Sequence, residues 1–149
     1  MENYQVSVKK TDALSPTELL TIMQERVRVF VVEQACPYQE IDGQDEMALH
    51  VCFWQGSELV AYARVIPHLD GRHISFGRVL VKAPYRGQEL GKALIRRTLA
   101  EIKNRFPQQE VQIAAQAYLT SFYATFGFTA ISSPYLEDGI LHIDMVRPS

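Results

Sequence analysis

A glycine-bearing loop between a predicted strand and a predicted helix is the segment most suited to chemistry. The strand signal over 78–81 is followed by Arg86, Gly87 and Gly91, and a helical pattern begins near Gly87. A helix start leaves backbone amides unpaired and carries partial positive charge, and glycine lets an anion approach closely. The loop therefore predicts a pyrophosphate site, although a strand-to-helix turn that merely needs glycine explains the spacing equally well.

Charged residues in predicted strands form a second group with chemical potential. Arg64 and Arg78 must each be paired or face a cleft, so each could hold a carboxylate through two hydrogen bonds or form an internal salt bridge. The acidic residues of segment 40–46 would attract a cation at a pocket mouth or form a solvated loop. A metal site made from His50, His142 and these carboxylates has no supporting spacing, so none is expected.

The elements that position these residues begin with a short strand and a helix. Val6 and Val8 alternate with polar residues and predict a strand over 5–9. Ser15-Pro16-Thr17-Glu18 predicts a capping box at a helix start. The helix continues with apolar residues at helical spacing, namely Leu19, Met23, Val27 and Phe30.

Three strands over 49–54, 59–66 and 74–81, joined by short turns, predict an antiparallel meander. A strand over 111–115, a helix over 119–126 and two strands in the tail come later. Between the meander and the strand over 111–115, a long helix runs to Arg105. Its predicted buried face consists of Ile95, Leu99, Ile102 and Phe106. The expected fold is an α/β protein with a mixed, mostly antiparallel sheet of about six to seven strands and helices on both faces, in a single domain over residues 1–149.

Composition excludes several function classes. The 149 residues suit one domain, and a net charge of −2 with pI about 6.1 argues against a nucleic-acid partner. Two cysteines are too few for a disulfide framework and show no metal-binding spacing. We expect no signal peptide, no membrane span and a cytoplasmic location, because no apolar run is long enough for either segment.

The order of three segments resembles a known family. The strand GRVLV, the loop and helix RGQELGKAL and the segment FYATFGF together resemble the GNAT N-acetyltransferase superfamily. RVRVFVVEQACPYQEIDGQDE, AQAYLTSFYATFGF and YLEDGILHIDM are similar to its ElaA-like subgroup, so the resemblance covers nearly the whole chain. One departure is Glu89, where the family usually has glycine. A carboxylate there repels a pyrophosphate unless it points outward.

The resemblance implies an N-acetyltransferase that moves an acetyl group from acetyl-coenzyme A (acetyl-CoA) to a primary amine by direct attack in a ternary complex. It implies that pantetheine pairs with the backbone of Leu80 and Val81 as an inserted strand, that the Val81 amide polarises the thioester, and that Phe122 contacts the cofactor. The pyrophosphate would lie on the loop, which consists of Arg86, Gly87, Gln88, Glu89, Leu90, Gly91 and Lys92.

Four side chains are candidates for proton transfer. The resemblance implies that Tyr123 protonates the departing thiolate, although a tyrosine among aromatic residues often only packs. An amine with a pKa of about 10.4 is about one part in a thousand neutral at pH 7, so a base is useful. Glu33 follows an apolar run and could be that base, or could simply accept backbone amides at a helix end. His50 and His142 suit proton transfer near neutral pH, or are structural.

Other functions share the same fold. A coenzyme A or acyl-coenzyme A sensor without turnover is one alternative, to which Glu89 gives some support. Acyl-homoserine-lactone synthases share the architecture and are faintly similar in the VFVVEQ region, but the chain is short for that class. Cys36 is expected to be an ordinary small residue, since no Cys-His motif accompanies it. The expected partner is a small-molecule amine, and the expected state is a monomer or homodimer.

Overall fold

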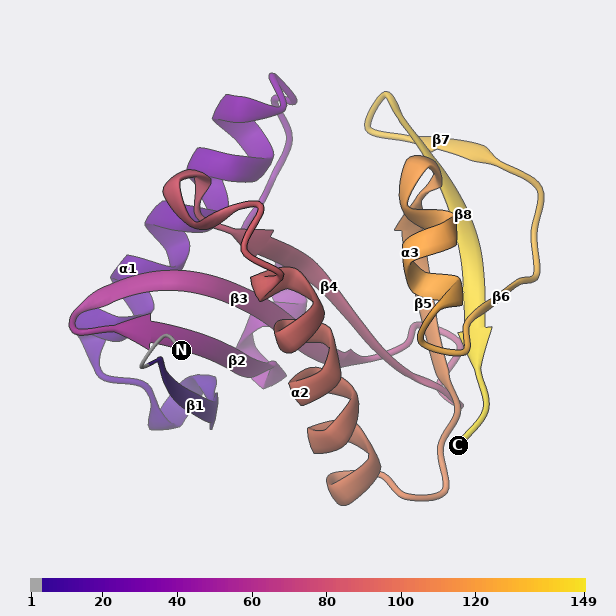
Figure 1. The fold of residues 1–149 in the computed structure, drawn as a ribbon, viewed down its shortest axis with the longest axis horizontal. Coiled ribbons are helices and arrows are strands. Elements are labelled where there is room, and N and C mark those ends of the chain that lie inside the picture. Colours follow the sequence, from indigo (N-terminus) through magenta and orange to yellow (C-terminus); the bar gives the residue numbers. More distant parts are fainter. Residues whose placement is uncertain (1–3) are drawn as a thin grey trace.

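A computed structural model describes residues 4–149 and contains a single eight-stranded sheet in the order β1-β2-β3-β4-β5-β8-β6, with β7 paired to β8 (Figure 1). All pairs are antiparallel except β4 and β5, which run parallel. The predicted mixed sheet is confirmed, but six to seven strands was too few, because the tail forms three strands. The strands are β1 (Gln5–Lys10), β2 (Leu49–Gln55), β3 (Glu58–Pro67), β4 (Ile74–Val81), β5 (Val111–Gln116), β6 (Thr129–Ala130), β7 (Tyr135–Glu137) and β8 (Ile140–Arg147).

Helices cover both faces of the sheet, as expected. Helix α1 continues directly into a π-helical segment, η2, while α2 and α3 pack on the opposite face (Figure 1). The α-helices are α1 (Pro16–Val27), α2 (Leu90–Arg105) and α3 (Thr120–Ala124). The other helical segments are η1 (Thr11–Ala13), η2 (Arg28–Glu33), η3 (Gly43–Met47), η4 (Ala83–Tyr85) and η5 (Ala117–Leu119).

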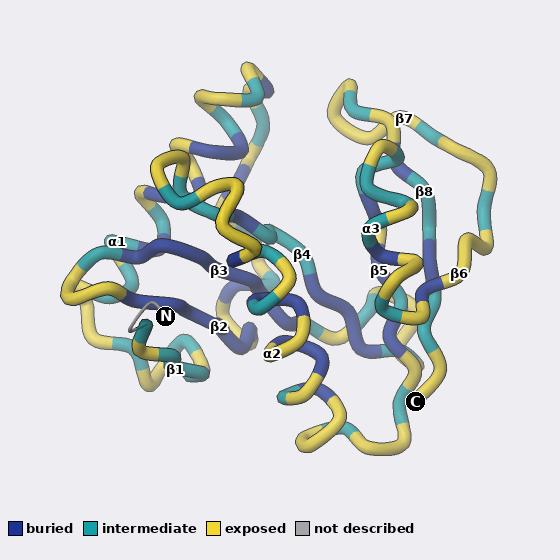
Figure 2. The backbone as a smooth tube through the Cα atoms, in the orientation of Figure 1, coloured by how far each residue is buried: buried dark blue, intermediate teal, exposed yellow. Residues whose placement is uncertain are grey.

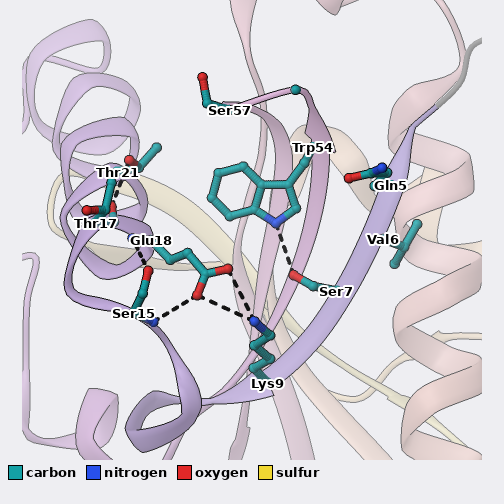
Figure 3. A pocket seen from close by; sticks show the side chains of 11 residues that line it. Gln5, Val6, Ser7, Lys9, Ser15, Thr17, Glu18, Thr21, Trp54 and Ser57 are labelled. Carbon is teal, nitrogen blue, oxygen red and sulfur yellow. Dashed lines mark hydrogen bonds and ion pairs between the residues drawn. The ribbon is translucent and has the colours of Figure 1, made fainter.

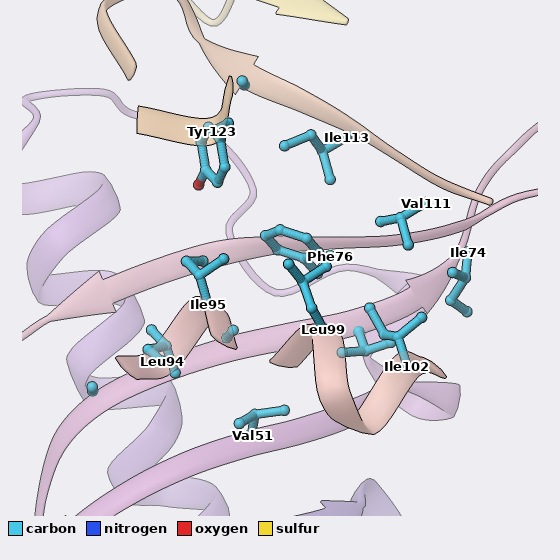
Figure 4. Packing of buried hydrophobic residues seen from close by; sticks show 14 of the residues in the cluster. Val51, Ile74, Phe76, Leu94, Ile95, Leu99, Ile102, Val111, Ile113 and Tyr123 are labelled. Carbon is cyan, nitrogen blue, oxygen red and sulfur yellow. The ribbon is translucent and has the colours of Figure 1, made fainter. Parts of the chain in front are cut away.

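The larger hydrophobic core lies between α2 and the sheet. Ile95, Leu99 and Ile102 of α2 are buried as predicted, and Phe106 is partly buried beside them. Figure 4 shows Ile95, Leu99 and Ile102 packed near Val51 and Phe76, and Figure 2 shows that burial is greatest along the central strands. This core fixes α2, and therefore the loop that precedes it, against β3 and β4.

Helix α1 confirms the predicted helix start. Ser15 and Glu18 form the capping box there. Of the apolar residues at helical spacing, Phe30 is buried, Leu19 and Met23 are partly buried and Val27 is exposed, whereas Ile22, Glu25 and Arg26 are buried. The helix faces the sheet with a charged residue because the Arg26 guanidinium finds carboxylate partners there, which satisfy its buried donors.

The sheet opens between β4 and β5. The two strands are paired at one register position, Ile74 with Val111, and Figure 1 shows them diverging beyond it. The β3–β4 register shifts between Tyr62 and Arg64, and Arg78 opposite this irregularity has a φ of 50°. Such a bulge bends a strand. Within residues 4–149, the C-terminal half of β4 therefore has no ladder partner on its β5 side.

Candidate active site

A cavity of about 950 Å³ occupies the opening between β4 and β5. Its walls come from η2, β3, β4, β5, α3, the β7–β8 hairpin and the segment that follows η2. Most of the predicted functional side chains line it, namely Glu33, Leu80, Val81, Arg86, Gly91, Phe122, Tyr123 and His142. The opening in the sheet thus collects residues from both halves of the chain.

The start of α2 lies at one end of this cavity and is uncapped. Its N-cap residue, Glu89, makes no side-chain cap, and the amides of Leu90, Gly91 and Lys92 bond to no other described residue. Helix α1, by contrast, has both sides of its capping box in place. The helix itself begins at Leu90, later than the predicted start near Gly87. Free amides with a partial positive charge are suited to an anion.

Glu89 adopts the backbone conformation that favours glycine, with a φ of 60°. Its side chain is 77% exposed and lies 3.2 Å from Lys92 Nζ, measured to Oε1. The carboxylate therefore points outward and is paired, which lessens the repulsion expected from its sequence position. The loop thus holds a residue with positive φ at this position without glycine.

Arg86 connects the loop to η2 and β4. Its Nε donates to the Val81 carbonyl at 2.7 Å, and Nη2 lies 2.9 Å from Glu33 Oε1. Glu33 is thus tied to the loop through Arg86 and is exposed at the cavity edge. This arrangement differs from a free general base, because the carboxylate already neutralises a cation.

Tyr123 is buried on the β5 side of the cavity. Its ring centroid lies 6.2 Å from that of Phe76 and 5.8 Å from that of Phe128, so it packs between the two halves of the sheet (Figure 4). Burial, and secondarily the neighbouring Tyr118, raises the pKa of Tyr123 to about 12. The phenol is therefore protonated at neutral pH and can donate.

His142 of β8 lines the cavity with a defined tautomer. Its Nδ1 lies 2.7 Å from the Ile140 carbonyl, which can only accept, so Nδ1 carries the proton of the neutral ring. Nε2 then holds a lone pair, 4.0 Å from Glu137 Oε2, and the ring stacks on Tyr135. This atom is a possible proton acceptor.

His50 lies apart from the cavity and is fully buried in β2. Its Nδ1 is 2.5 Å from the Tyr62 hydroxyl and its Nε2 is 2.7 Å from Thr11 Oγ1, which donates to the Asp45 carbonyl. Burial, with the nearby Arg26, lowers the pKa of His50 to about 4. The ring is therefore neutral and held by a chain of hydrogen bonds, and nothing connects it to the predicted chemistry.

A largely buried cluster of charged side chains lies on the α1 side of the cavity, and three of its members, Asp42, Arg64 and Arg78, line the cavity itself. Arg26 Nε donates to Glu40 Oε2 at 2.8 Å, and its Nη1 donates to Asp45 Oδ1 at 2.6 Å. Arg64 and Arg78 bring two more guanidinium groups from β3 and β4. We call this set the charged wall, which consists of Arg26, Glu40, Asp42, Asp45, Arg64 and Arg78.

The charged wall is held together by strong mutual stabilisation. Burial alone would raise the pKa of Asp45, but hydrogen bonds from Arg26 and from the Asp42 amide outweigh it and bring the value to about 2. Burial would likewise lower the pKa of Arg26, and its bond to Asp45 reverses that effect. The Tyr38 hydroxyl donates to Glu40, and the Arg78 guanidinium lies over the Tyr38 ring.

Comparison with known proteins agrees with this geometry. The profile of the acetyltransferase (GNAT) domain family matches residues 18–148 of the chain. The chain belongs to the GNAT acetyltransferase family. Protein ElaA of Escherichia coli (strain K12) is 43% identical over 137 residues, which are 90% of either protein. These matches confirm the predicted GNAT and ElaA-like membership.

Solved GNAT structures show the same arrangement of elements. An acyl-CoA N-acyltransferase from Pseudomonas aeruginosa superposes with a TM-score of 0.93 at 38% identity, covering 97% of this chain and 99% of that one. A CoA-dependent acyl-homoserine lactone synthase, BjaI, superposes with a TM-score of 0.81 at 14% identity, which shows a shared fold alone. Family and fold together support acyl transfer from a coenzyme A derivative.

In this GNAT protein, sequence reasoning left the nature of the charged wall open. Arg64 and Arg78 were each expected to form an internal salt bridge or to face a cleft. Each of them forms internal salt bridges and also lines the cavity. Glu40 and Asp45 are buried, whereas Glu46 is exposed, so the acidic segment is not one solvated loop. Arg26 was missed entirely. A signal was present, since an arginine interrupts the positions that face the sheet.

A second cavity of this GNAT protein, about 390 Å³, lies between α1 and β1 and contains no predicted site residue (Figure 3). Lys9 Nζ pairs with Glu18 Oε2 at 3.3 Å, and the Trp54 indole donates to Ser7 Oγ at 3.0 Å. These four side chains are thus paired with one another. Among residues 4–149, no cluster of histidine, cysteine or acidic side chains is arranged to hold a metal, and no helix is long and apolar enough to cross a membrane.

Proposed function

We propose that this protein is an N-acetyltransferase that transfers an acetyl group from acetyl-CoA to a primary amine in a ternary complex. One observation carries the proposal: a single cavity joins the open edge of β4, the uncapped start of α2 and the hydroxyl-bearing Tyr123. The open edge can pair with pantetheine amides, and the helix start can receive the pyrophosphate. The chain thus offers complementary groups along the length of an acyl-coenzyme A.

Tyr123 has the role of general acid in this proposal. The amine nitrogen attacks the thioester carbonyl carbon, the carbon–sulfur bond breaks, and the leaving thiolate takes the Tyr123 proton. A pKa of about 12 keeps this phenol protonated at neutral pH, so its proton is available to the sulfur as the carbon–sulfur bond breaks. The Val81 amide polarises the thioester oxygen as charge develops on it.

His142 is the favoured proton acceptor for the amine. Its Nε2 lone pair is available because Nδ1 donates to the Ile140 carbonyl. Glu33, the other candidate, is engaged with Arg86, so we assign it the role of holding Arg86 at the phosphate loop. His50 is left out of the mechanism because it lies outside the cavity.

Calorimetric titration with acetyl-CoA, and separately with NADH, tests the ligand. Binding of acetyl-CoA alone, at micromolar concentration, supports the proposal. Arg86→Ala should weaken that binding in a salt-dependent way, because it removes a cation from the loop. The control is Arg97→Ala, which removes an exposed arginine paired with Glu101 on α2. Equal affinities for both variants would mean that the loop is not the phosphate site.

Thiol release with a panel of primary amines tests the reaction. Amine-dependent release of free coenzyme A, with acetyl transferred to the amine by mass spectrometry, is the expected result. Binding of acetyl-CoA without release for any amine would instead favour a sensor that lacks turnover. Comparison of acetyl with longer acyl donors separates acetyl transfer from the transfer of larger groups.

A further inference from the structure

Arg64 of β3 uses one edge of its guanidinium group in ion pairs and leaves the other edge unpaired. The side chain is buried, and Nη1 lies 2.9 Å from Asp42 Oδ1 and 3.1 Å from Asp45 Oδ1. Nε is buried without a hydrogen-bond partner, and Nη2 bonds to no other residue within 4–149. Nε and Nη2 form the edge of a guanidinium that grips a carboxylate side-on. A buried N–H without an acceptor is costly, so this edge calls for a partner.

The other arginines of the charged wall do not share this feature. Arg26 donates from all three nitrogens, to Glu40 and Asp45. Arg78 donates from Nε and Nη2 to Glu40 and stacks over Tyr38. The open side-on edge is therefore specific to Arg64, which lines the large cavity, whereas Arg26 does not.

The protein has no spare carboxylate on this wall to fill that edge. Its three arginines are matched by three acidic residues, Glu40, Asp42 and Asp45, all of which already accept from arginine. A planar carboxylate from a bound molecule fits the vacant pair of donors, and arginine binds such groups bidentately.

Carboxylates of the β7–β8 hairpin also line the cavity. Glu137, Asp138 and Asp144 of the β7–β8 hairpin line the same cavity, and none pairs with a lysine or arginine among the described residues. They favour the ammonium form of an incoming amine before it loses a proton. A molecule with a carboxylate at one end and an amine at the other can use both the unpaired edge of Arg64 and these hairpin carboxylates.

We infer that the acceptor is an amine that carries a carboxylate, and that Arg64 binds this carboxylate through Nε and Nη2. The inference rests on the proposed function for the fate of the amine, because it names the class of molecule to be acylated. Arg64 is then a residue that determines acceptor specificity, separate from the groups that move protons.

The test uses pairs of acceptors that differ in one group. Glycine, β-alanine, γ-aminobutyrate and the α-amino acids are each compared with the corresponding carboxamide in the thiol-release assay. We expect kcat/KM to favour at least one carboxylate over its amide by at least ~10-fold, the size of a charge-assisted hydrogen-bonded pair. The amide has the less basic amine, so intrinsic reactivity at neutral pH favours the opposite order.

Two variants test whether the preference for carboxylate acceptors depends on the Arg64 guanidinium. Arg64→Lys keeps the charge but loses the side-on pair of donors, so the carboxylate preference, taken as the ratio of kcat/KM for carboxylate and amide within the variant, should fall toward 1 even if the lost pairing with Asp42 and Asp45 lowers the turnover of both acceptors. Arg78→Lys is the matched control and should keep the preference. Equal kcat/KM for carboxylates and amides in the unmodified protein would overturn the inference, as would a preference lost in Arg78→Lys and retained in Arg64→Lys.

A binding measurement separates this inference from the proposed reaction. Saturation-transfer NMR with coenzyme A present reports whether each amino carboxylate or amide binds, without turnover. Selective binding of a carboxylate that is lost in Arg64→Lys supports the site even if no thiol is released, in which case the proposed reaction alone fails. No selective binding of any carboxylate means that only water completes the Arg64 edge, and the inference is wrong.

Discussion

The two sides of the large cavity are built in different ways. The proposed cofactor side is local in sequence: β4, the loop and the start of α2 lie within residues 74–92, and most of what they offer is backbone. The proposed acceptor side is made of charged side chains that come from α1, the segment after η2, β3 and β4. One side depends on backbone shape, whereas the other depends on long-range pairing of buried charges.

This difference predicts different responses to mutation. A backbone site tolerates side-chain changes, which explains how Glu89 can stand where glycine is usual. A buried cluster of ion pairs tolerates little, because removing one partner leaves the other charge unpaired in a poorly solvated place. Changes on the acceptor side should therefore appear first as lost stability, and changes on the cofactor side as altered binding or rate.

Arg26→Met should have the largest effect. It leaves Glu40 and Asp45 without their buried partner and should lower the free energy of unfolding by about 3–5 kcal/mol in urea denaturation. The matched control, Arg97→Met, breaks an exposed pair with Glu101 and should cost less than about 1 kcal/mol. Similar losses in both variants would remove the distinction between the two sides.

His50→Gln should change how stability depends on pH. The folded pKa of His50, about 4, is below the unfolded value near 6.5, so the unfolded chain binds the extra proton. The contribution of neutral His50 to the free energy of unfolding is fully present above about pH 6.5. It is lost as the pH falls toward 4, and the total loss is on the order of 3 kcal/mol. Urea midpoints at pH 7 and pH 5 should therefore differ more for the unmodified protein than for the variant. Equal differences would show that His50 is protonated in the folded state.

Tyr123→Phe should act on rate alone. Loss of the hydroxyl should lower kcat by roughly 100-fold with little change in the affinity for acetyl-CoA, if the phenol protonates the thiolate. Tyr85→Phe is the control, because that hydroxyl lies outside the cavity and bonds to Gln55 and Glu58. Unchanged turnover in the Tyr123 variant would remove it from the chemistry.

Glu89→Gly and Glu89→Gln should have the smallest effects. Both remove a carboxylate from the phosphate loop and free Lys92, so the affinity for acetyl-CoA should rise roughly two- to five-fold at low salt. Only the glycine variant also relieves the positive φ, which should add less than about 1 kcal/mol of stability. Weaker binding by Glu89→Gln would mean that the carboxylate supports the loop.

The local parts of this molecule could be predicted from sequence. The capping box of Ser15 and Glu18, the exact range of β4 and the buried face of α2 all follow from patterns within a few residues. The loop before α2 was found because glycine, a preceding strand and a following helix are sequence neighbours. The predicted cofactor side is therefore mostly a matter of short-range signals.

The acceptor side could not be predicted in the same way. Arg26 and Asp45 are separated by a helix end, the π-helical η2 and an irregular segment, so no local pattern pairs them. His50 has the residue type expected of a catalytic group, and only the tertiary structure shows that Tyr62 and Thr11 occupy both ring nitrogens. The tertiary structure therefore determines which buried charged groups pair with one another.

The single register position shared by β4 and β5 has a mechanical consequence. Beyond Ile74 and Val111, the angle between the two halves of the sheet is set by side-chain packing, in which Phe76 meets Tyr123 and Phe128. Aromatic contacts can slide where a hydrogen-bonded ladder cannot. A molecule inserted between β4 and β5 would supply the hydrogen bonds that the two strands do not make with each other. It would thereby fix the angle between the two halves of the sheet, so binding would also make the whole protein more rigid.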